Sequence, residues 1–88
     1  MADAPWHVYI VRCNDESLYT GVAKELDLRI AQHNAGVGAK YTRSRRPVTL
    51  VYWETAADRG AAQQREFAIK QLSPVAKRRL VQGAATNP

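Results

Sequence analysis

The sequence predicts an α+β fold in which a three-stranded antiparallel sheet carries three flanking helices in the order ββαβαα. Three observations lead to this expectation. Stretches rich in β-branched and aromatic residues occur three times, and a short run of turn-forming residues joins the first two. Apolar residues at helical spacing follow the second and third stretches. With 88 residues, the chain is expected to form one domain with a small core.

The first two strands are expected to form a hairpin. His7 to Arg12 contains four consecutive β-branched or aromatic residues, which predicts a strand buried on both faces at the centre of the sheet. The turn formers Asn14 to Ser17 follow, and Leu18 to Val22 returns as the second strand.

The register of this hairpin decides where its two tyrosines point. If Cys13 paired with Leu18, Tyr9 and Tyr19 would project from opposite faces of the sheet. A turn or bulge that shifts the register by one residue puts both on the same face. We expect the shifted register, because a site shared by the two tyrosines requires it.

The middle of the chain predicts a helix, a loop and a strand. Leu26 to Ala35 has helical periodicity, with Asp27 either as its N-cap or as an acid in its first turn, and Gly36 suits a left-handed position after its end. Val37 to Pro47 is expected to be an exposed basic loop. Val48 to Glu54 is β-branched and aromatic and forms the third predicted strand.

Two helices are predicted after the third strand. Thr55 to Asp58 resembles a capping box and is expected to open a helix that runs to about Leu72. Ser73 is a predicted cap for the last helix, Pro74 to Gln82, which we expect to stop at Gly83.

The rest of the chain sets the expected organisation and location. Residues 1–5 are expected to be a mobile tail, residues 6–82 a single domain, and residues 83–88 a frayed end. The N-terminus lacks the features of a signal peptide, and no apolar stretch approaches the roughly 20 residues of a membrane span. The single cysteine, Cys13, allows neither an internal disulfide nor a cysteine-based metal site, and we expect it to be a small buried apolar residue. We therefore expect a soluble, cytoplasmic protein without membrane contact.

The net charge of +5 is unevenly distributed. No acidic residue lies between Asp27 and Glu54, whereas this interval holds Arg29, Lys40, Arg43, Arg45 and Arg46. A second basic group spans Lys77 to Arg79. Clustered positive charge favours a polyanionic partner, above all a nucleic acid backbone, and a solvated basic surface is the alternative.

Two short motifs stand ten positions apart on the predicted hairpin. They are Tyr9-Ile10-Val11 and Tyr19-Thr20-Gly21, and Arg29 follows on the next helix. Together with the helix junction from Arg65 to Ser73, they resemble the two half-motifs and flanking helices of the GIY-YIG endonuclease superfamily. The resemblance covers roughly Trp6 to Val81 and is best to the small stand-alone bacterial (YhbQ-like) branch.

The resemblance implies a magnesium-dependent endonuclease that hydrolyses phosphodiester bonds in DNA, in repair or on branched or flapped structures, with Mn²⁺ as a substitute cation. It implies that Glu66 binds the metal, that Tyr9 or Tyr19 takes a proton from water, and that His33 belongs to the site. One carboxylate with phosphate oxygens and waters is sufficient to hold Mg²⁺. Arg29 offers a planar, bidentate contact to phosphate. We expect these five side chains to converge on one concave surface.

Each of these residues has a purely structural alternative. The tyrosines could be half-buried strand residues, Arg29 could pair with Glu25, His33 could be a helix C-terminal cation, and Glu66 could pair only with Lys70. The candidate nucleic-acid contacts, which could instead be plain surface, are Lys40, Tyr41, Arg43, Arg45, Arg46 and Lys70. For the whole protein, the alternative is a nucleic-acid-binding module that cuts weakly or only with a protein partner. The sequence does not distinguish DNA from RNA.

Overall fold

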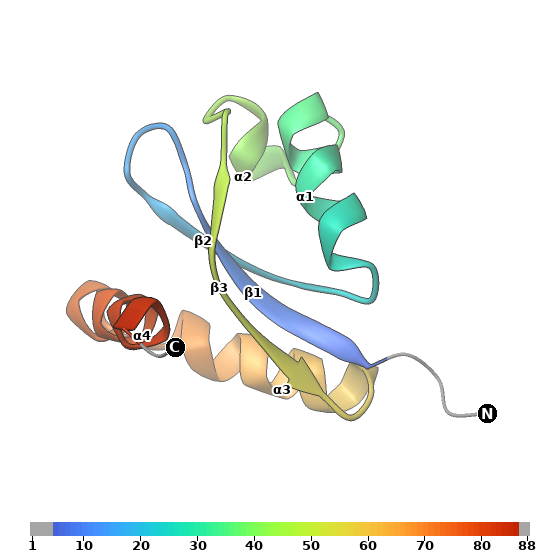
Figure 1. The fold of residues 1–88 in the computed structure, drawn as a ribbon, viewed down its shortest axis with the longest axis vertical. Helices are drawn as coiled ribbons and strands as arrows, with labels where there is room; N and C mark the ends of the chain where they lie inside the picture. The colour runs from blue at the N-terminus through green and yellow to red at the C-terminus, as the bar shows by residue number, and fades with distance from the viewer. Residues whose placement is uncertain (1–4, 87–88) are drawn as a thin grey trace.

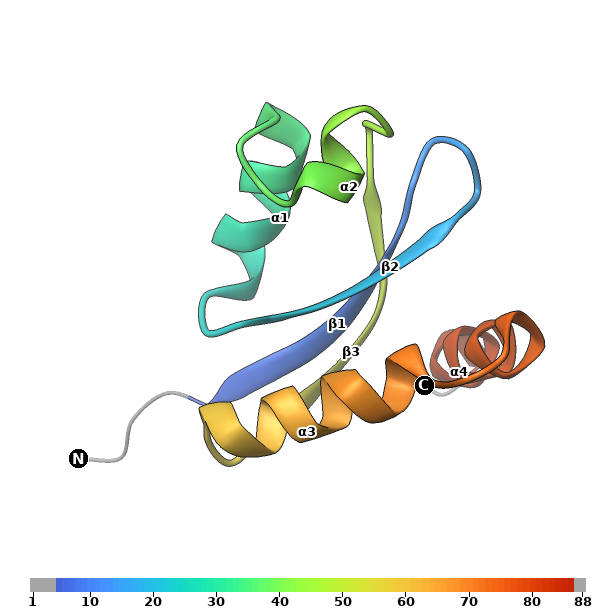
Figure 2. The same cartoon turned by 180° about the vertical axis from the view of Figure 1, so that it is seen from behind.

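The computed structural model describes residues 5–86 and has three layers, with the sheet in the middle (Figure 1). The strands β1 (Trp6–Arg12), β2 (Leu18–Ala23) and β3 (Thr49–Ala56) pair antiparallel in the order β2-β1-β3. The helices α1 (Leu26–Ala35) and α2 (Lys40–Arg43) lie on one face. The helices α3 (Arg59–Lys70) and α4 (Pro74–Thr86) lie on the other, as the reverse view also shows (Figure 2). The predicted fold class and element order are confirmed, with one extra helical turn, α2.

The central strand β1 divides the core into two halves. Its residues Val8, Tyr9, Ile10 and Val11 are all fully buried, as expected for a strand covered on both faces. Because side chains alternate along a strand, Tyr9 and Val11 pack toward α1, whereas Val8 and Ile10 pack toward α3 and α4. The strand therefore couples both layers of helices.

The hairpin has the register that a shared tyrosine site requires. Tyr9 pairs with Gly21, and Val11 pairs with Tyr19, so both tyrosines project from the face that α1 covers. The turn is closed by a hydrogen bond from Cys13 N to Ser17 O at 2.8 Å. Cys13 is 2% exposed, which confirms its predicted burial.

The first helix confirms its predicted end. Gly36 has a φ of 84°, a left-handed conformation that glycine adopts without strain. Glu25 occupies the N-cap without a side-chain bond, which leaves Asp27 as an acid in the first turn. The segment after Gly36 departs from the predicted exposed loop, because Lys40–Arg43 forms a helical turn whose Thr42 is fully buried.

The predicted start of α3 is wrong. Pairing between β1 and β3 extends to Ala56, so Thr55 lies in the strand and does not open a helix. Asp58 is the cap, since its carboxylate accepts a hydrogen bond from Ala61 N at 2.8 Å. The helix ends at Lys70, two residues before the predicted Leu72.

The last helix begins where the sequence predicts and ends later. Ser73 Oγ accepts a hydrogen bond from Ala76 N at 3.1 Å, which confirms the cap. The predicted stop at Gly83 is wrong, since α4 continues to Thr86. A helical glycine costs only about 1 kcal/mol, and the alanines that follow favour the helix. Of the predicted tail over residues 1–5, residues 1–4 lie outside the described part of the chain, as do the final residues 87–88.

Within residues 5–86, no helix combines the length and the apolar character that a membrane span needs.

Candidate active site

Three aromatic side chains from three elements meet beneath α1. The Tyr9 hydroxyl of β1 lies 2.7 Å from Nε2 of His33 on α1. The His33 ring is edge-on to Tyr9 and to Tyr19 of β2, with ring centroids 5.8 and 5.5 Å apart. Tyr9 and His33 are fully buried, whereas Tyr19 is half-buried. The hairpin and α1 therefore place one phenol at the surface and one inside, against the same imidazole.

Two glycines make this packing possible. A Cβ at Gly21, which pairs with Tyr9 across the hairpin, would lie 2.5 Å from the Tyr9 hydroxyl oxygen. A Cβ at Gly38 would lie 2.5 Å from Nδ1 of His33. Both distances are too short for non-bonded atoms, so any other residue would displace the Tyr9 or His33 ring.

The second ring nitrogen of His33 also has a partner. Nδ1 lies 2.7 Å from the Thr42 hydroxyl oxygen, and this hydroxyl donates to the Ala39 carbonyl oxygen at 3.0 Å. The turn of helix α2 thus places a buried hydroxyl directly behind the imidazole.

Burial sets the protonation of the two buried groups. It raises the pKa of the Tyr9 phenol, an effect that the nearby Arg29 guanidinium opposes and that Tyr19 and Glu66 reinforce. Burial and, secondarily, the charge of Arg29 lower the pKa of His33. At neutral pH the site therefore holds a protonated phenol against a neutral imidazole.

Arg29 of α1 also acts on this site, since its charge affects both Tyr9 and His33. It is half-buried, and its Nη1 donates to Gln32 Oε1 at 3.3 Å. Among the described residues it forms no ion pair with Glu25, so that structural alternative is wrong. Most of its donors are thus available to an anion beside Tyr9.

Glu66 and Lys70 come from the opposite layer. They lie on α3, which packs against β2, and Lys70 Nζ is 3.1 Å from Glu66 Oε2. Lys70 Nζ also lies 5.9 Å from the centre of the Tyr19 ring. The Glu66 charge contributes to the raised pKa of Tyr9. The pairing with Lys70 that was an alternative for Glu66 is present, at the edge of the sheet where the tyrosines lie.

The basic segment around α2 divides into two pairs of cations. Arg45 stacks 4.0 Å from the centre of the Tyr41 ring and pairs with Asp15 at 3.0 Å. Arg46 donates to the backbone oxygens of Arg43 and Asn34 at 2.9 and 3.4 Å. Both side chains therefore brace the segment, a structural role that the sequence did not predict.

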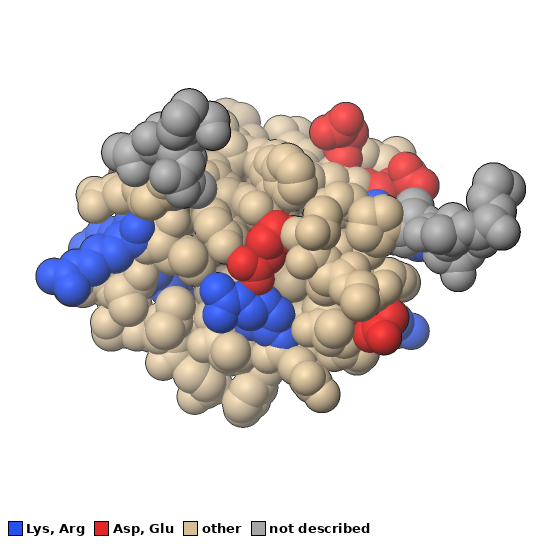
Figure 3. Space-filling view, turned by 60° about the horizontal axis from the view of Figure 1, so that its bottom comes forward, with Lys and Arg blue, Asp and Glu red and all other residues tan. Residues whose placement is uncertain are grey.

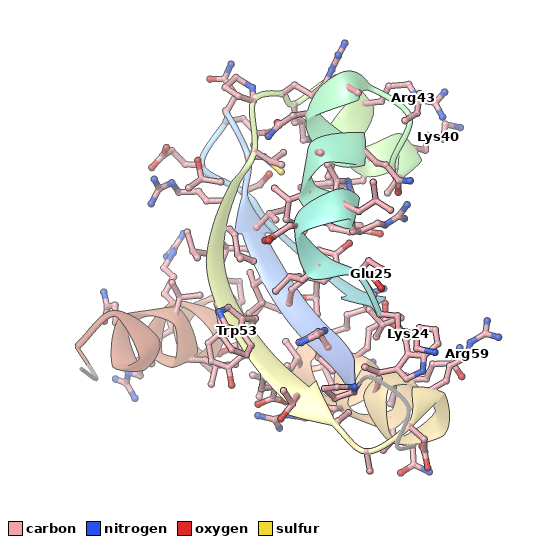
Figure 4. All side chains as sticks on the ribbon, turned by 45° about the vertical axis from the view of Figure 1, so that its right-hand side comes forward. Lys24, Glu25, Lys40, Arg43, Trp53 and Arg59 are labelled. Atoms are coloured by element: carbon pink, nitrogen blue, oxygen red, sulfur yellow. The ribbon has the colours of Figure 1, made fainter. Side chains whose placement is uncertain are left out.

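The other pair is exposed. Lys40 and Arg43 lie close together at the α2 end of the molecule in Figure 4, and within the described chain their side chains make no hydrogen bond or ion pair. Arg43 also lines a surface hollow with Asn34, Ser44, Arg46 and Pro47. Tyr41, 39% exposed, stacks on Tyr19 with centroids 5.8 Å apart. This exposed pair and Tyr41 form a basic and aromatic border beside the site.

The face that presents α3 and α4 has a different character. Figure 3 shows its Lys, Arg, Asp and Glu side chains scattered between large areas of other residues.

Comparison with known proteins shows the family. Residues 5–79 match the GIY-YIG catalytic domain. The chain belongs to the GIY-YIG family. This GIY-YIG chain is 58% identical over 80 residues to a UPF0213 protein of Desulfotalea psychrophila. The aligned residues cover 90% of this chain and 73% of that protein. It is 49% identical over 79 residues to a UPF0213 protein of Staphylococcus haemolyticus, with 90% and 96% coverage.

Solved structures of relatives share the GIY-YIG chain's fold. The solution structure of a UPF0213 protein from Bacillus halodurans is 41% identical, with a TM-score of 0.58 and coverage of 89% of this chain and 83% of that one. A solution structure from E. faecalis is 30% identical, with a TM-score of 0.61 and coverage of 99% and 94%. The predicted family and fold are confirmed by these matches.

The GIY-YIG site offers one carboxylate, that of Glu66, to a divalent cation. No group of three or more His, Cys, Asp or Glu side chains with the arrangement of a metal cage occurs among the described residues. Glu66 supplies one carboxylate near Tyr9. Mg²⁺ commonly binds through one or two carboxylates together with waters and substrate phosphates. The donor set therefore fits a magnesium ion that Glu66 holds together with a phosphate-containing substrate.

Sequence reasoning missed several residues of the GIY-YIG site. Thr42 and Gly38 were treated as loop residues, and Gly21 only as part of a motif. Thr42 is fully buried, and both glycines lie against reactive side chains. A buried position in a short segment without clear periodicity leaves no local signal, so no pattern in the sequence could have identified Thr42.

Proposed function

We propose that this GIY-YIG protein is a magnesium-dependent endonuclease that hydrolyses phosphodiester bonds in DNA, in repair or on branched or flapped structures. The observation that carries the proposal is the buried contact between the Tyr9 hydroxyl and His33 Nε2 at 2.7 Å, beside Arg29 and Glu66. A phenol, a proton acceptor, a cation and a carboxylate are the groups that phosphodiester hydrolysis needs.

The Tyr9–His33 pair supplies the general base. A phenol with a raised pKa does not ionise by itself at neutral pH, so Tyr9 requires an acceptor for its proton. Neutral His33 is that acceptor, because its lowered pKa keeps Nε2 unprotonated. Tyr9 is 0% exposed, so the attacking water has to enter beside its hydroxyl together with the substrate. As Tyr9 takes a proton from this water, it passes its own proton to His33. The water oxygen then forms the new bond to phosphorus while the bond to the leaving oxygen breaks.

Arg29 and Glu66 act on the phosphate. The guanidinium of Arg29 binds two phosphate oxygens in one plane and stabilises the charge that grows on them. Glu66 would hold the magnesium ion, which when bound supplies further stabilisation of that charge. Lys70 Nζ lies 3.1 Å from Glu66 Oε2 and partly neutralises this carboxylate.

The border beside the site favours a polyanionic substrate. The side chains of Lys40 and Arg43 are exposed and make no hydrogen bond or ion pair within the described chain. Tyr41 offers a partly exposed ring on which a base could stack. Arg45 and Arg46 reach phosphates only with donors that remain free after their existing bonds. Arg45 bonds to Asp15 and the Tyr41 carbonyl oxygen, and Arg46 bonds to the carbonyl oxygens of Arg43 and Asn34.

The decisive experiment replaces the metal-binding carboxylate. Glu66→Gln keeps the volume of the side chain and removes its charge. Cleavage of a panel of branched, flapped and linear DNAs, and of matched RNAs, with Mg²⁺ or Mn²⁺ should fall about 100-fold or more, because a catalytic metal stabilises the transition state by several kcal/mol. Binding measured without metal should persist or strengthen, because a negative charge near phosphate is gone.

The matched control is Glu16→Gln, the same chemical change at a side chain that is 82% exposed in the β1–β2 turn. It should leave cleavage unchanged. If the wild-type protein cuts nothing with either cation and Glu66→Gln alters neither binding nor stability, the endonuclease proposal fails. The protein would then be a nucleic-acid-binding module, for which the exposed Lys40 and Arg43 are the supporting observation.

A further inference from the structure

The order of protons around His33 follows from the groups on either side of it. The Ala39 carbonyl oxygen can only accept, so the single hydroxyl proton of Thr42 is donated to it across 3.0 Å. The Thr42 oxygen then faces Nδ1 of His33, 2.7 Å away, without a proton of its own to offer. Nδ1 must therefore carry the proton of the neutral ring and donate it to Thr42.

The opposite ring nitrogen is fixed by the same reasoning. In a neutral imidazole with Nδ1–H, Nε2 has a lone pair and accepts. The Tyr9 hydroxyl, 2.7 Å from Nε2, is then the donor. The chain of donors runs in one direction, from Tyr9 to His33, from His33 to Thr42, and from Thr42 to the backbone of Ala39.

We propose that Thr42 is a positioning residue that holds His33 in the Nδ1–H tautomer, so that Nε2 stays open to receive the proton of Tyr9. The inference rests on the proposed function, since it explains how His33 is kept able to accept a proton in that reaction. Thr42 does not touch the reacting atoms and acts only through His33.

Burial makes the assignment specific. Tyr9, His33 and Thr42 are each 0% exposed, so bulk water has no access to replace a missing partner. In the other tautomer, the Nδ1 lone pair would face the Thr42 oxygen lone pair unless Thr42 gave up its bond to Ala39. That tautomer therefore costs one buried hydrogen bond, and its Nε2–H would point at the Tyr9 oxygen.

The surroundings keep the ring in this orientation. Gly38 leaves no side chain against Nδ1, where a Cβ would lie 2.5 Å away. Tyr9 and Tyr19 pack edge-on against the imidazole from the sheet, and the positive charge of Arg29 acts on it from α1. When His33 receives the Tyr9 proton, both ring N–H groups have acceptors, the Tyr9 oxygen and the Thr42 oxygen. Thr42 thus serves the ring before and after proton transfer.

The test combines histidine NMR with cleavage assays on three variants. Thr42→Val keeps the shape and removes the hydroxyl, Thr42→Ser keeps the hydroxyl, and Thr20→Val makes the same change at a buried threonine that pairs with Ile10 and so belongs to the opposite face. Long-range ¹H–¹⁵N spectra of ¹⁵N-histidine protein distinguish Nδ1–H from Nε2–H directly. His7→Gln identifies which signals belong to His33.

We expect His33 of the wild type, Thr42→Ser and Thr20→Val to be in the Nδ1–H form. In Thr42→Val the Nε2–H form should become populated, and cleavage should fall about 10- to 100-fold, by analogy with the loss of a partner that orients a metal-bound histidine. Thr42→Ser should cut within a few-fold of the wild type. Backbone ¹H–¹⁵N spectra report whether each variant is folded. If Thr42→Val does not fold, the tautomer of His33 in the wild type and in Thr42→Ser tests the proposal.

The outcomes separate this inference from the proposed function. An Nε2–H form of His33 in the wild type, or an unchanged tautomer in folded Thr42→Val, overturns the positioning role whatever the cleavage. A tautomer shift with undiminished cleavage overturns its catalytic consequence. If the wild type cuts nothing while the tautomer shifts as expected, the endonuclease proposal is at fault, and Thr42 is left with a role in the order of hydrogen bonds alone.

Discussion

Tyr9 shows how one residue can serve the core and the site at once. Its ring is fully buried on the central strand, and its hydroxyl contacts His33. The position opposite Tyr9 on β2 is Gly21, which has no side chain to occupy the space of the phenol. The glycine of the second half-motif is therefore explained by the tyrosine of the first.

Gly21→Ala should damage both stability and activity. The new Cβ would lie 2.5 Å from the Tyr9 hydroxyl oxygen and 2.7 Å from Cζ, and Tyr9 is a fully buried side chain. We expect the free energy of unfolding, measured in urea, to fall by about 1–3 kcal/mol, the usual cost of overpacking a core. The Tyr9–His33 contact should break, with a matching loss of cleavage.

Gly60→Ala is the matched control, since its Cβ would meet only Asp58 Oδ1 at 3.5 Å, an ordinary contact. Its stability should be unchanged or higher by up to about 1 kcal/mol, because alanine favours a helix. Equal stabilities for the two variants would mean that Gly21 is not required by Tyr9.

At the scale of the element, α2 converts a basic loop into a supporting part of the site. Its single turn carries Thr42 inward against His33 and Tyr41 sideways against Tyr19. In the segment after α2, Arg45 forms an ion pair with Asp15, and Arg46 donates a hydrogen bond to the Asn34 carbonyl oxygen. The cations left for a partner are Lys40 and Arg43, on the outer side of the turn (Figure 4).

The double variant Lys40→Ala/Arg43→Ala should weaken nucleic-acid binding to a similar degree across sequences. It should also reduce the salt dependence, because the slope of log K against log salt falls by about 0.9 for each phosphate of duplex DNA that the protein no longer neutralises. Titrations at several salt concentrations measure this slope.

Arg59→Ala/Arg79→Ala removes the same charge from other helices, α3 and α4, and should keep the wild-type slope. Figure 4 shows Arg59 at the opposite end from Lys40 and Arg43. Equal slopes for both double variants would assign the salt dependence to net charge and remove α2 from the interface.

For the whole molecule, the site lies where both helical layers reach the edge strand β2. The layer of α1 and α2 supplies Arg29, His33 and Thr42, and the layer of α3 supplies Glu66. The sheet between them supplies the tyrosines. Stability and function therefore both depend on the buried imidazole of His33, whose pKa is lowered in the folded protein.

The stability of the protein should decrease below pH 6.5 because of His33. Its pKa is lowered in the folded state by burial and by Arg29, so the unfolded chain binds a proton first as the pH falls through 6.5. This contribution is complete above 6.5 and is lost toward the lower folded pKa, with a slope of at most about 1.4 kcal/mol per pH unit. Urea unfolding at pH 7.5 and 5.5 measures it.

In His33→Gln that slope should be absent, because glutamine does not titrate. Asp15, whose pKa is lowered by its hydrogen bonds to Ser17, contributes only at lower pH, around and below its ordinary value of 3.8. An identical loss of stability in both proteins between pH 7.5 and 5.5 would show that His33 is not the titrating group.

The sequence by itself determined the order of strands and helices, the central position of β1, the Gly36 and Ser73 caps, and the family. The strands, helices and caps depend on residues close in the chain, because side-chain periodicity and capping involve neighbours within four positions. The family follows from short motifs that can each be read locally. Even the hairpin register could be inferred, because a shift of one residue decides whether Tyr9 and Tyr19 lie on the same face of the sheet, and a shared site requires the same face.

Only the tertiary structure decided the burial of Thr42, the bracing by Arg45 and Arg46 and the direction of hydrogen bonds around His33. The contact between Tyr9 and His33 joins residues 24 positions apart, and that between Arg45 and Asp15 joins residues 30 apart. The Tyr9–His33 contact forms where packing on the sheet buries both groups, whereas the Arg45–Asp15 pair lies at the surface, where the fold brings two distant turns together. Local propensity carries no information about such distant partners, so the proton order of the site emerges only once the layers have assembled.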